Sequence, residues 1–368
     1  MSYTKMFGFY EISPIQIGNY VGVESTILLG SLNGKSKLEC FKTCSLKPDC
    51  LLLQFDTSKS CSFYKSIQSP NQSNSYTYFY RKTKNKGIIL NYNSQVVQGS
   101  KEKSSFGIWN NVFHIQPFTF KDHLNLTTLD FKQNIITKID ENTFYNLSKL
   151  IILDLALNKI QAINNKAFEP LIKVEILYLY SNSLEYLNPN VFNGLRNLKY
   201  LSLGLNKFRS IEKGLFNDLK NLQILHFYVN FLDKITSEFS SLTNLEFLNL
   251  EFNQIAVIEE GSFWNMSKLI RLNLNNNKLK TINMSSFEGL DSLTQLNLSY
   301  NLLISIDSNA FKCSINLREL YIQSNAINYL NESVFFGLNN LSIVTMGKSL
   351  FDSKNFSAFY PNTNFTKF

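Results

Sequence analysis

The chain has 368 residues, of which 44% are hydrophobic and 17% are charged, and its formal net charge is +8 at pH 7. This balance excludes a chain that is disordered throughout, because disordered chains have few apolar residues to bury. No stretch approaches the roughly 18 consecutive apolar residues of a membrane-spanning helix, so we expect no membrane span in this chain.

The first hundred residues contain four of the five cysteines. The spacing is Cys40-x3-Cys44-x5-Cys50-x10-Cys61. The capping box Ser36-Lys37-Leu38-Glu39 predicts a short helix from about Lys37 to Leu46. Apolar and aromatic runs predict strands at 51–55, 62–64 and 76–80. A helix joined to strands by two disulfides suits a domain of about 80 residues, because so small a core needs covalent support.

Basic residues are concentrated in the same part of the chain. Residues 1–105 hold 13 Lys and Arg against 6 Asp and Glu, whereas residues 106–368 hold 23 against 22. The densest run, Arg81 to Lys86, leads into a segment that we interpret as a solvated basic linker over 84–105. The alternative is a contact for acidic glycans or membrane lipids. No zinc spacing or RNA-binding aromatic motif accompanies the run, so we expect no nucleic-acid partner.

Asparagine recurs every 24 residues along the rest of the chain, with one step of 23. The positions are Asn134, Asn158, Asn182, Asn206, Asn230, Asn253, Asn277, Asn301 and Asn325. Apolar residues precede each asparagine by 8, 5 and 3 positions, as Leu150, Leu153 and Leu155 precede Asn158. This L-x-x-L-x-L-x-x-N frame predicts a solenoid whose short strands stack into one parallel sheet with the leucines inward.

Two repeated side chains have structural explanations. An asparagine amide can satisfy backbone groups where the chain leaves the strand, so we assign no ligand chemistry to these nine residues. Phenylalanine recurs ten residues later in the coil, and an aromatic at the repeat period predicts core on the convex side. The 23-residue step reflects a deletion between Ile235 and Phe239 on that side. The frame degenerates before Asn110 and after Leu341, where Ser349 replaces the asparagine and we expect a final irregular coil.

The frame also predicts which residues line the concave face, because positions 6, 4 and 2 before each asparagine point away from the core. Aromatic residues gather there on four adjacent strands, around Gly204, which we expect to leave a notch. They are Tyr178, Tyr180, Tyr200, His226, Tyr228 and Phe247. Aromatics with a polar end are typical anchors of binding sites, and they predict a ligand site here. Alternatively, cross-strand aromatic stacking only stabilises the sheet.

Signs of catalysis are few. The chain has three histidines, and none lies beside a plausible nucleophile in the sequence. Nucleotide-binding and metalloprotease motifs are absent, so we predict no enzyme, no metal and no cofactor. Cys313 stands where neighbouring repeats have glycine, and we predict a half-buried free thiol. N-glycosylation motifs occur at Asn71, Asn125, Asn146, Asn265, Asn283, Asn297, Asn331, Asn340, Asn355 and Asn364.

Both parts of the chain resemble known families. The cysteine spacing, the capped helix and Leu51-Leu52-Leu53-Gln54-Phe55 resemble the PAN/apple fold over roughly residues 7–82, and this resemblance implies the disulfides Cys40–Cys61 and Cys44–Cys50. Residues 106–368 resemble the 24-residue leucine-rich repeats of animal extracellular proteins. The expected architecture is therefore an α/β solenoid, a horseshoe with a parallel concave sheet (106–368), after a small disulfide-linked α+β domain (1–83) and the linker 84–105.

The resemblance implies an extracellular or cell-surface recognition protein of adhesion, receptor or matrix type that binds a protein ligand on the concave face. The alternative is recognition of a glycan or glycosaminoglycan through the basic first domain and the Tyr/Asn concave face. Residues Met1 to Met6 do not form a signal peptide. We therefore expect that the leader of a secreted protein is missing from this sequence.

The implied disulfides give a first prediction. Non-reducing peptide mapping of protein made in a secretory host should recover Cys40–Cys61 and Cys44–Cys50, with Cys313 free. Each bridge in so small a domain should contribute about 2–4 kcal/mol, so reduction should unfold residues 1–82 and leave the repeats folded. A bridge to Cys313, or four free thiols before residue 62, would contradict the PAN/apple resemblance.

Overall fold

A computed structural model describes residues 112–353 and 360–367, together with the backbone of short strands upstream. These strands are β1 (Thr26–Leu32), β2 (Leu52–Phe55), β3 (Cys61–Ser66), β4 (Phe79–Tyr80), β5 (Ile89–Leu90), β6 (Val96–Val97) and β7 (Ser105–Trp109). The predicted helix from Lys37 to Leu46 and the predicted disulfides lie outside the described residues. Strands β1, β3 and β2 form an antiparallel sheet in that order, and β5 pairs with β6 inside the segment interpreted as a linker.

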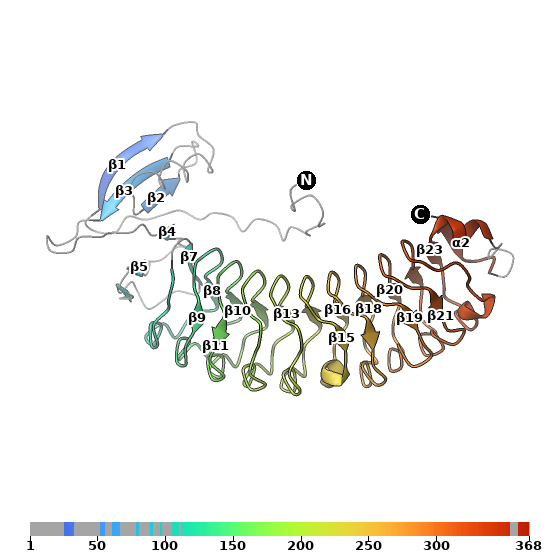
Figure 1. Ribbon diagram of the computed structural model, residues 1–368. Helices are drawn as coiled ribbons and strands as arrows, with labels where there is room; N and C mark the ends of the chain where they lie inside the picture. The colour runs from blue at the N-terminus through green and yellow to red at the C-terminus, as the bar shows by residue number, and fades with distance from the viewer. Residues whose placement is uncertain are drawn as a thin grey trace.

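The strands of the repeats lie along the inner side of a curved array (Figure 1), and together with the upstream strand β4 they form one sheet of 13 strands. After β7 the sheet strands are β8 (Thr128–Asp130), β10 (Ile152–Asp154), β12 (Ile176–Tyr178), β13 (Tyr200–Ser202), β14 (Ile224–His226), β16 (Phe247–Asn249), β18 (Arg271–Asn273), β20 (Gln295–Asn297), β22 (Glu319–Tyr321), β23 (Ile343–Met346) and β24 (Asn364–Lys367). Neighbours from β7 to β24 are parallel, as in the pairing of Leu153 with Leu177, and β4 is antiparallel to β7. Central strand residues such as Leu153 and Leu177 are fully buried, which confirms the predicted inward leucines.

The outer side of each coil returns mainly through turns. Short parallel pairs lie there: β9 (Lys138–Ile139) with β11 (Ala162–Ile163), β15 (Lys234–Ile235) with β17 (Val257–Ile258), and β19 (Thr281–Ile282) with β21 (Ser305–Ile306). Among the described residues, the 3-10 helices are η2 (Ser237–Ser241), at the predicted deletion, and η3 (Glu332–Phe335). Within residues 112–353 and 360–367, α-helix is confined to α2 (Lys348–Ser353). The solenoid and its parallel sheet are as expected, but the described coils return through turns, short strand pairs and 3-10 helices, so they form a parallel β-solenoid without the helical layer of an α/β architecture.

The repeated asparagines tie each coil to the one before it. Asn158 Oδ1 accepts a hydrogen bond from Ile136 N at 3.0 Å, and its Nδ2 donates to Phe131 O at 2.9 Å, both in the preceding coil. The same Nδ2 donates to Leu155 O in its own coil at 3.1 Å. All nine asparagines accept the equivalent backbone bond. The predicted structural role of these residues is confirmed.

The nine repeated asparagines from Asn134 to Asn325 form an asparagine ladder along the array. The residue before each of them has a left-handed backbone conformation and turns the chain off the strand. Its φ lies between 50° and 60° in all nine coils, and in one coil the residue is the β-branched Val229, with φ 50°. Left-handed backbone is costly for such a side chain. The bonds of the adjacent asparagine therefore stabilise a turn that the local sequence does not favour.

The phenylalanine series is core, as predicted. Stacked rings with centroids 5.8–6.5 Å apart join Phe144, Phe168, Phe192, Phe216 and Phe239, and then Phe263, Phe287 and Phe311. Sequence reasoning missed a second asparagine series near the start of five coils. Asn197, Asn221, Asn244, Asn316 and Asn340 each donate through Nδ2 to a carbonyl of the preceding coil at 2.6–3.4 Å.

Both ends of the array depart from the repeat frame. At the start, Ser105 lies 5 positions before Asn110, as Leu129 lies 5 positions before Asn134, so the repeat frame would place Ser105 beside Leu129. In the structure the backbone of Phe106 pairs with that of Leu129 instead, so the frame is one residue out of register there. At the far end, the expected final coil exists: α2 includes Ser349, and β24 extends the sheet. Phe365 is only 8% exposed, and its ring contacts those of Phe335 and Tyr360.

The asparagine ladder gives a second prediction. Asn206→Ala should lower the free energy of unfolding by about 2–4 kcal/mol, because it leaves several buried backbone groups without partners. Asn221→Ala is the matched control: its single bond to Arg196 O is exposed, so the loss should be below about 1 kcal/mol. Denaturant unfolding measures both. Equal losses would contradict the ladder's role.

Candidate functional site

The six predicted concave residues form one continuous aromatic ladder. Tyr178 (β12), Tyr200 (β13), His226 (β14) and Phe247 (β16) contact one another in sequence, with ring centroids 5.2, 5.3 and 5.3 Å apart. Tyr180 lies edge-on to Tyr178 at 6.2 Å, and Tyr228 lies edge-on to His226 at 5.9 Å. All six are half-buried, so each ring packs on its neighbours and still presents surface to the concave side.

Gly204 does not leave the notch that the sequence suggested. A methyl group at this position would lie 2.6 Å from Cε1 of Tyr228, because the tyrosine ring covers the glycine. The expectation of an open notch is therefore wrong. The missing side chain makes room for Tyr228, so the space above Gly204 is filled.

A cation lies at each end of the aromatic ladder. Arg271 Cζ stands 4.7 Å from the ring centroid of Phe247, and Lys132 Nζ stands 5.7 Å from that of Tyr180. Both distances are within the range of cation–π attraction. The sequence frame placed both residues on the concave face, but spacing alone did not reveal that they border the rings.

The aromatic ladder is uncharged near pH 7. Burial raises the pKa of Tyr200 above its usual value and that of Tyr228 to about 12. Burial and the nearby Arg271 lower the pKa of His226 to about 4, so its imidazole is neutral. Its Nδ1 is buried and makes no hydrogen bond within the described residues. The site therefore offers apolar surface, phenol groups and no net charge of its own.

Acidic residues lie beside Lys132 on the first described strands of this face. Asp154 and Asp130 are direct neighbours on β10 and β8. Burial and the adjacent Asp130 raise the pKa of Asp154 to about 7. The Asp154 carboxylate also accepts a hydrogen bond from Ala156 N at 2.9 Å. Asn249 and Asn297 make the equivalent bond in later coils, so this position carries a structural contact in each case.

Beyond Phe247 the concave face becomes polar, and several of its amides are occupied by internal bonds. Asn249 Nδ2 and Asn275 Nδ2 donate to the two carboxylate oxygens of Glu251, at 3.0 and 3.2 Å. Asn249 and Asn275 are largely buried, with 6% and 9% exposure. These groups rigidify the face, and less of their hydrogen-bonding capacity is available to a ligand than the sequence suggested.

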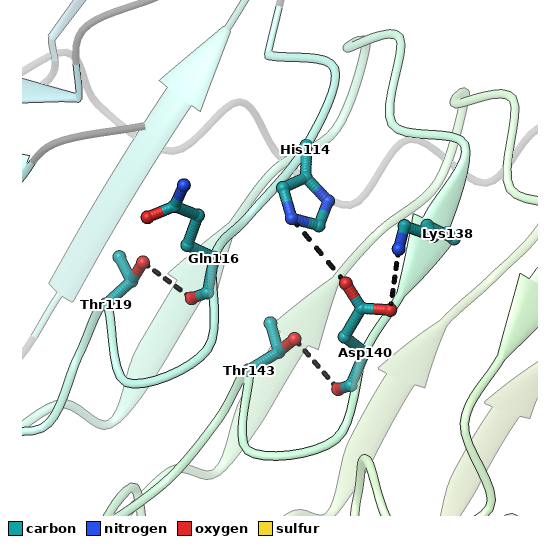
Figure 2. A network of polar contacts seen from close by, with 6 residues as sticks. All are labelled: His114, Gln116, Thr119, Lys138, Asp140 and Thr143. Atoms are coloured by element: carbon teal, nitrogen blue, oxygen red, sulfur yellow. Dashed lines mark hydrogen bonds and ion pairs between the residues drawn. The ribbon is translucent and has the colours of Figure 1, made fainter. Parts of the chain in front are cut away.

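A separate polar network lies outside the concave sheet, beside β9 (Figure 2). His114 Nε2 and Lys138 Nζ approach opposite oxygens of Asp140, at 3.5 and 3.0 Å. Thr119 and Thr143 donate through their hydroxyls to the carbonyls of Gln116 and Asp140. The residues in one coil lie 24 positions from their counterparts in the next, so the network repeats a turn motif and we assign it a structural role.

Neither a metal site nor a membrane helix is found in the described residues. No group of three or more His, Cys, Asp and Glu side chains there is placed to hold a metal ion. No helix in that part of the chain combines the length and apolar character needed to cross a membrane. Cys313 is a free, half-buried thiol, as predicted.

The fold is that of a solenoid protein in which a parallel sheet forms a continuous concave surface. The family model described as leucine rich repeat matches residues 109–156, 148–208, 196–255, 248–303 and 296–350. These ranges cover more than half of the chain, and the chain belongs to the leucine-rich-repeat family. A search of curated proteins found no match.

Solved structures support the same fold. TLR13, in a complex with ssRNA13, is 32% identical over 62% of this chain and 33% of its own, with a TM-score of 0.57. Toll from Drosophila, in a complex with Spatzle in the glycosylated form, is 26% identical over 67% of this chain and 33% of its own, with a TM-score of 0.62. An internalin from Listeria monocytogenes is 22% identical over 74% of this chain and 85% of its own, with a TM-score of 0.50. The chain thus spans about a third of the TLR13 and Toll chains it matches.

Asp154 gives a pH-dependent prediction. Its pKa is raised from an ordinary value of 3.8 to about 7, so the folded state binds the proton more tightly than the unfolded state. The resulting stabilisation is full below about pH 4 and is lost as the pH rises through about 7. Asp154→Asn keeps an acceptor for Ala156 N without the charge, so it should gain about 1–2 kcal/mol over the wild type between pH 4 and pH 8.

Denaturant unfolding across this pH range measures the difference. Asp130→Asn serves as the matched control. It removes a charge that raises the Asp154 pKa, so the stabilisation from protonated Asp154 should be lost at a lower pH than in the wild type. A difference between Asp154→Asn and wild type that does not change with pH would show that Asp154 titrates normally.

Proposed function

We propose that this chain is the recognition part of an extracellular or cell-surface protein that binds a protein ligand on the aromatic ladder. The observation that carries the proposal is the continuity of six half-exposed aromatic residues across four adjacent strands. Uncharged aromatic surface with phenol groups gives large contact area at a small cost in conformational entropy. Lys132 and Arg271 at its ends would orient a partner with complementary charges.

The family supports a binding role over a catalytic one. Leucine-rich-repeat solenoids present extended concave surfaces to partners. Toll is named in a complex with the protein Spatzle, and TLR13 in a complex with an RNA. We carry the protein-binding role and the extracellular setting over to this chain. We also retain the disulfide-linked PAN/apple-like domain over 1–83 and glycosylation as parts of the same proposal.

Glycan recognition is the second candidate. Half-exposed aromatic rings with phenol groups, as at Tyr200 and Tyr228, suit sugars, which combine apolar faces with hydroxyl groups. The basic segment before the array would attract acidic glycans. Because the TLR13 structure is named with an RNA, the binding experiment also includes single-stranded RNA, a partner that the sequence did not lead us to expect.

The test uses wild-type protein and the variants Tyr200→Ser and Tyr228→Ser. Immobilised protein is exposed to extracellular extract, a glycan array and single-stranded RNA, and any captured partner is titrated against each variant. Binding should fall by about 2 kcal/mol, or roughly 30-fold, at one or both positions. The free energy of unfolding should fall by only about 0.5–1.5 kcal/mol for each lost aromatic contact.

Tyr186→Ser is the matched control, because Tyr186 is 54% exposed and follows Tyr178 and Tyr180 in the same coil, past Asn182, without joining the aromatic ladder. Tyr186→Ser should change neither the affinity for the partner nor the free energy of unfolding. Large destabilisation by Tyr200→Ser with unchanged affinity would mean that the rings serve the fold and that the ligand binds elsewhere. A partner found only on the glycan array or with RNA would replace the protein ligand by the corresponding class.

A further inference from the structure

His226 is the polar group at the centre of the aromatic ladder, and its imidazole makes no hydrogen bond. Neither ring nitrogen bonds to a residue that the structure describes. Nδ1 is fully buried, whereas Nε2 retains contact with solvent. The rings of Tyr200, Tyr228 and Phe247 surround the imidazole, with centroids 5.3–5.9 Å away. Aromatic packing therefore holds His226 in place, and one of its nitrogens is open to a ligand.

Burial indicates which nitrogen of His226 carries the hydrogen. A neutral imidazole has one N–H group and one lone pair. Among backbone groups, a buried N–H without a partner is rarer than a buried acceptor without one, and we apply the same preference to the imidazole. The lone pair therefore belongs on the buried Nδ1 and the hydrogen on Nε2. The centre of the face thus offers a hydrogen-bond donor.

Arg271 adds a positive charge beside this donor. Its side chain is exposed and forms no ion pair with any residue in the described part of the chain. Phe247 is a common neighbour of both groups: its ring centroid lies 4.7 Å from Cζ of Arg271 and 5.3 Å from the imidazole centroid of His226. The charge of Arg271 acts on the imidazole, because it helps to lower the pKa of His226 to about 4.

No acid offsets the effect of Arg271 on His226, whose pKa is shifted only by burial and by that arginine. Glu251 lies in the coil of Phe247, but its two carboxylate oxygens already accept hydrogen bonds from Asn249 and Asn275. The basic segment before the array, with 13 Lys and Arg against 6 Asp and Glu over residues 1–105, has the wrong charge to bind beside Arg271. An anionic group from a partner has the complementary charge.

We propose that His226 and Arg271 form a subsite for an aspartate or glutamate side chain of the protein partner. The carboxylate accepts a hydrogen bond from Nε2 of His226 and is attracted by the charge of Arg271, while neighbouring apolar groups of the partner pack on the aromatic ladder. The inference rests on the proposed function and specifies which chemical group the ladder selects.

A carboxylate at this position would leave a signature on His226. It would stabilise the protonated imidazole and oppose the effect of Arg271, so the pKa of His226 should be higher in the complex than its free value of about 4. Binding would therefore take up protons as the pH falls toward about 5, below which the partner's own carboxyl group becomes protonated.

The experiment uses the full chain with 15N-labelled histidine, in which three imidazoles give signals and His226→Gln identifies that of His226. The probes are the capped peptides acetyl-Tyr-Glu-Tyr-amide and acetyl-Tyr-Gln-Tyr-amide. The glutamate peptide should bind about fivefold more tightly and raise the pKa of His226, and the glutamine peptide should leave that pKa unchanged. Acetyl-Tyr-Gln-Tyr with a free terminal carboxylate is a third probe, and tighter binding of this peptide would assign the subsite to a chain terminus instead.

Arg271→Gln should abolish the preference for the glutamate peptide. Lys278→Gln is the matched control: Lys278 lies in the same coil, is exposed and donates to Gln254 Oε1 at 3.1 Å, so its loss should preserve the preference. Equal binding of the two capped peptides, or a hydrogen on Nδ1 of the free protein, would overturn this inference and leave the proposed function intact. Unchanged His226 signals with all three peptides would count against both.

Discussion

The side-chain amide of the repeated asparagine is the interaction on which the array depends. Each coil must leave its strand through a left-handed residue, and one of those residues is Val229, for which that conformation is strained. The neighbouring asparagine offsets the cost by satisfying backbone groups in two coils at once, as Asn230 does with Leu203 O of the preceding coil and Phe227 O of its own coil. Local strain and contact between coils are therefore linked, and a coil cannot adopt its turn without a neighbour.

The same constraint creates the candidate site. Because the asparagines fix the register of successive coils, outward positions on neighbouring strands face one another for the whole length of the sheet. Aromatic residues at positions 6 and 4 before the asparagine then alternate into a continuous row, from Tyr178 through Tyr200 and His226 to Phe247. A shift of one residue in any coil would turn its aromatic side chain into the core. The same set of bonds therefore fixes both the register of the fold and the arrangement of the candidate site.

The period of the sequence predicted the sheet, the inward leucines, the phenylalanine core and the membership of the concave face, because each depends on position within the repeat. It did not predict how side chains of neighbouring coils pack against one another. Gly204 suggested a notch, and only the rotamer of Tyr228 shows that it is filled. Where the repeat degenerates, the frame also failed: Phe106 replaced Ser105 opposite Leu129, and α2 formed where an asparagine turn was absent.

The electrostatics of the concave face limit the kind of partner that it can hold. Burial lowers the pKa of His226 to about 4 and raises the pKa values of Tyr200 and Tyr228, so the centre of the face is neutral and would bind a partner through contact area and hydrogen bonds. The charges of Lys132 and Arg271 stand at the two ends, where they remain partly hydrated. Charges in such positions contribute more to orientation and association rate than to affinity. A partner that fits the proposed arrangement would have an apolar or stacking centre and complementary groups at its margins.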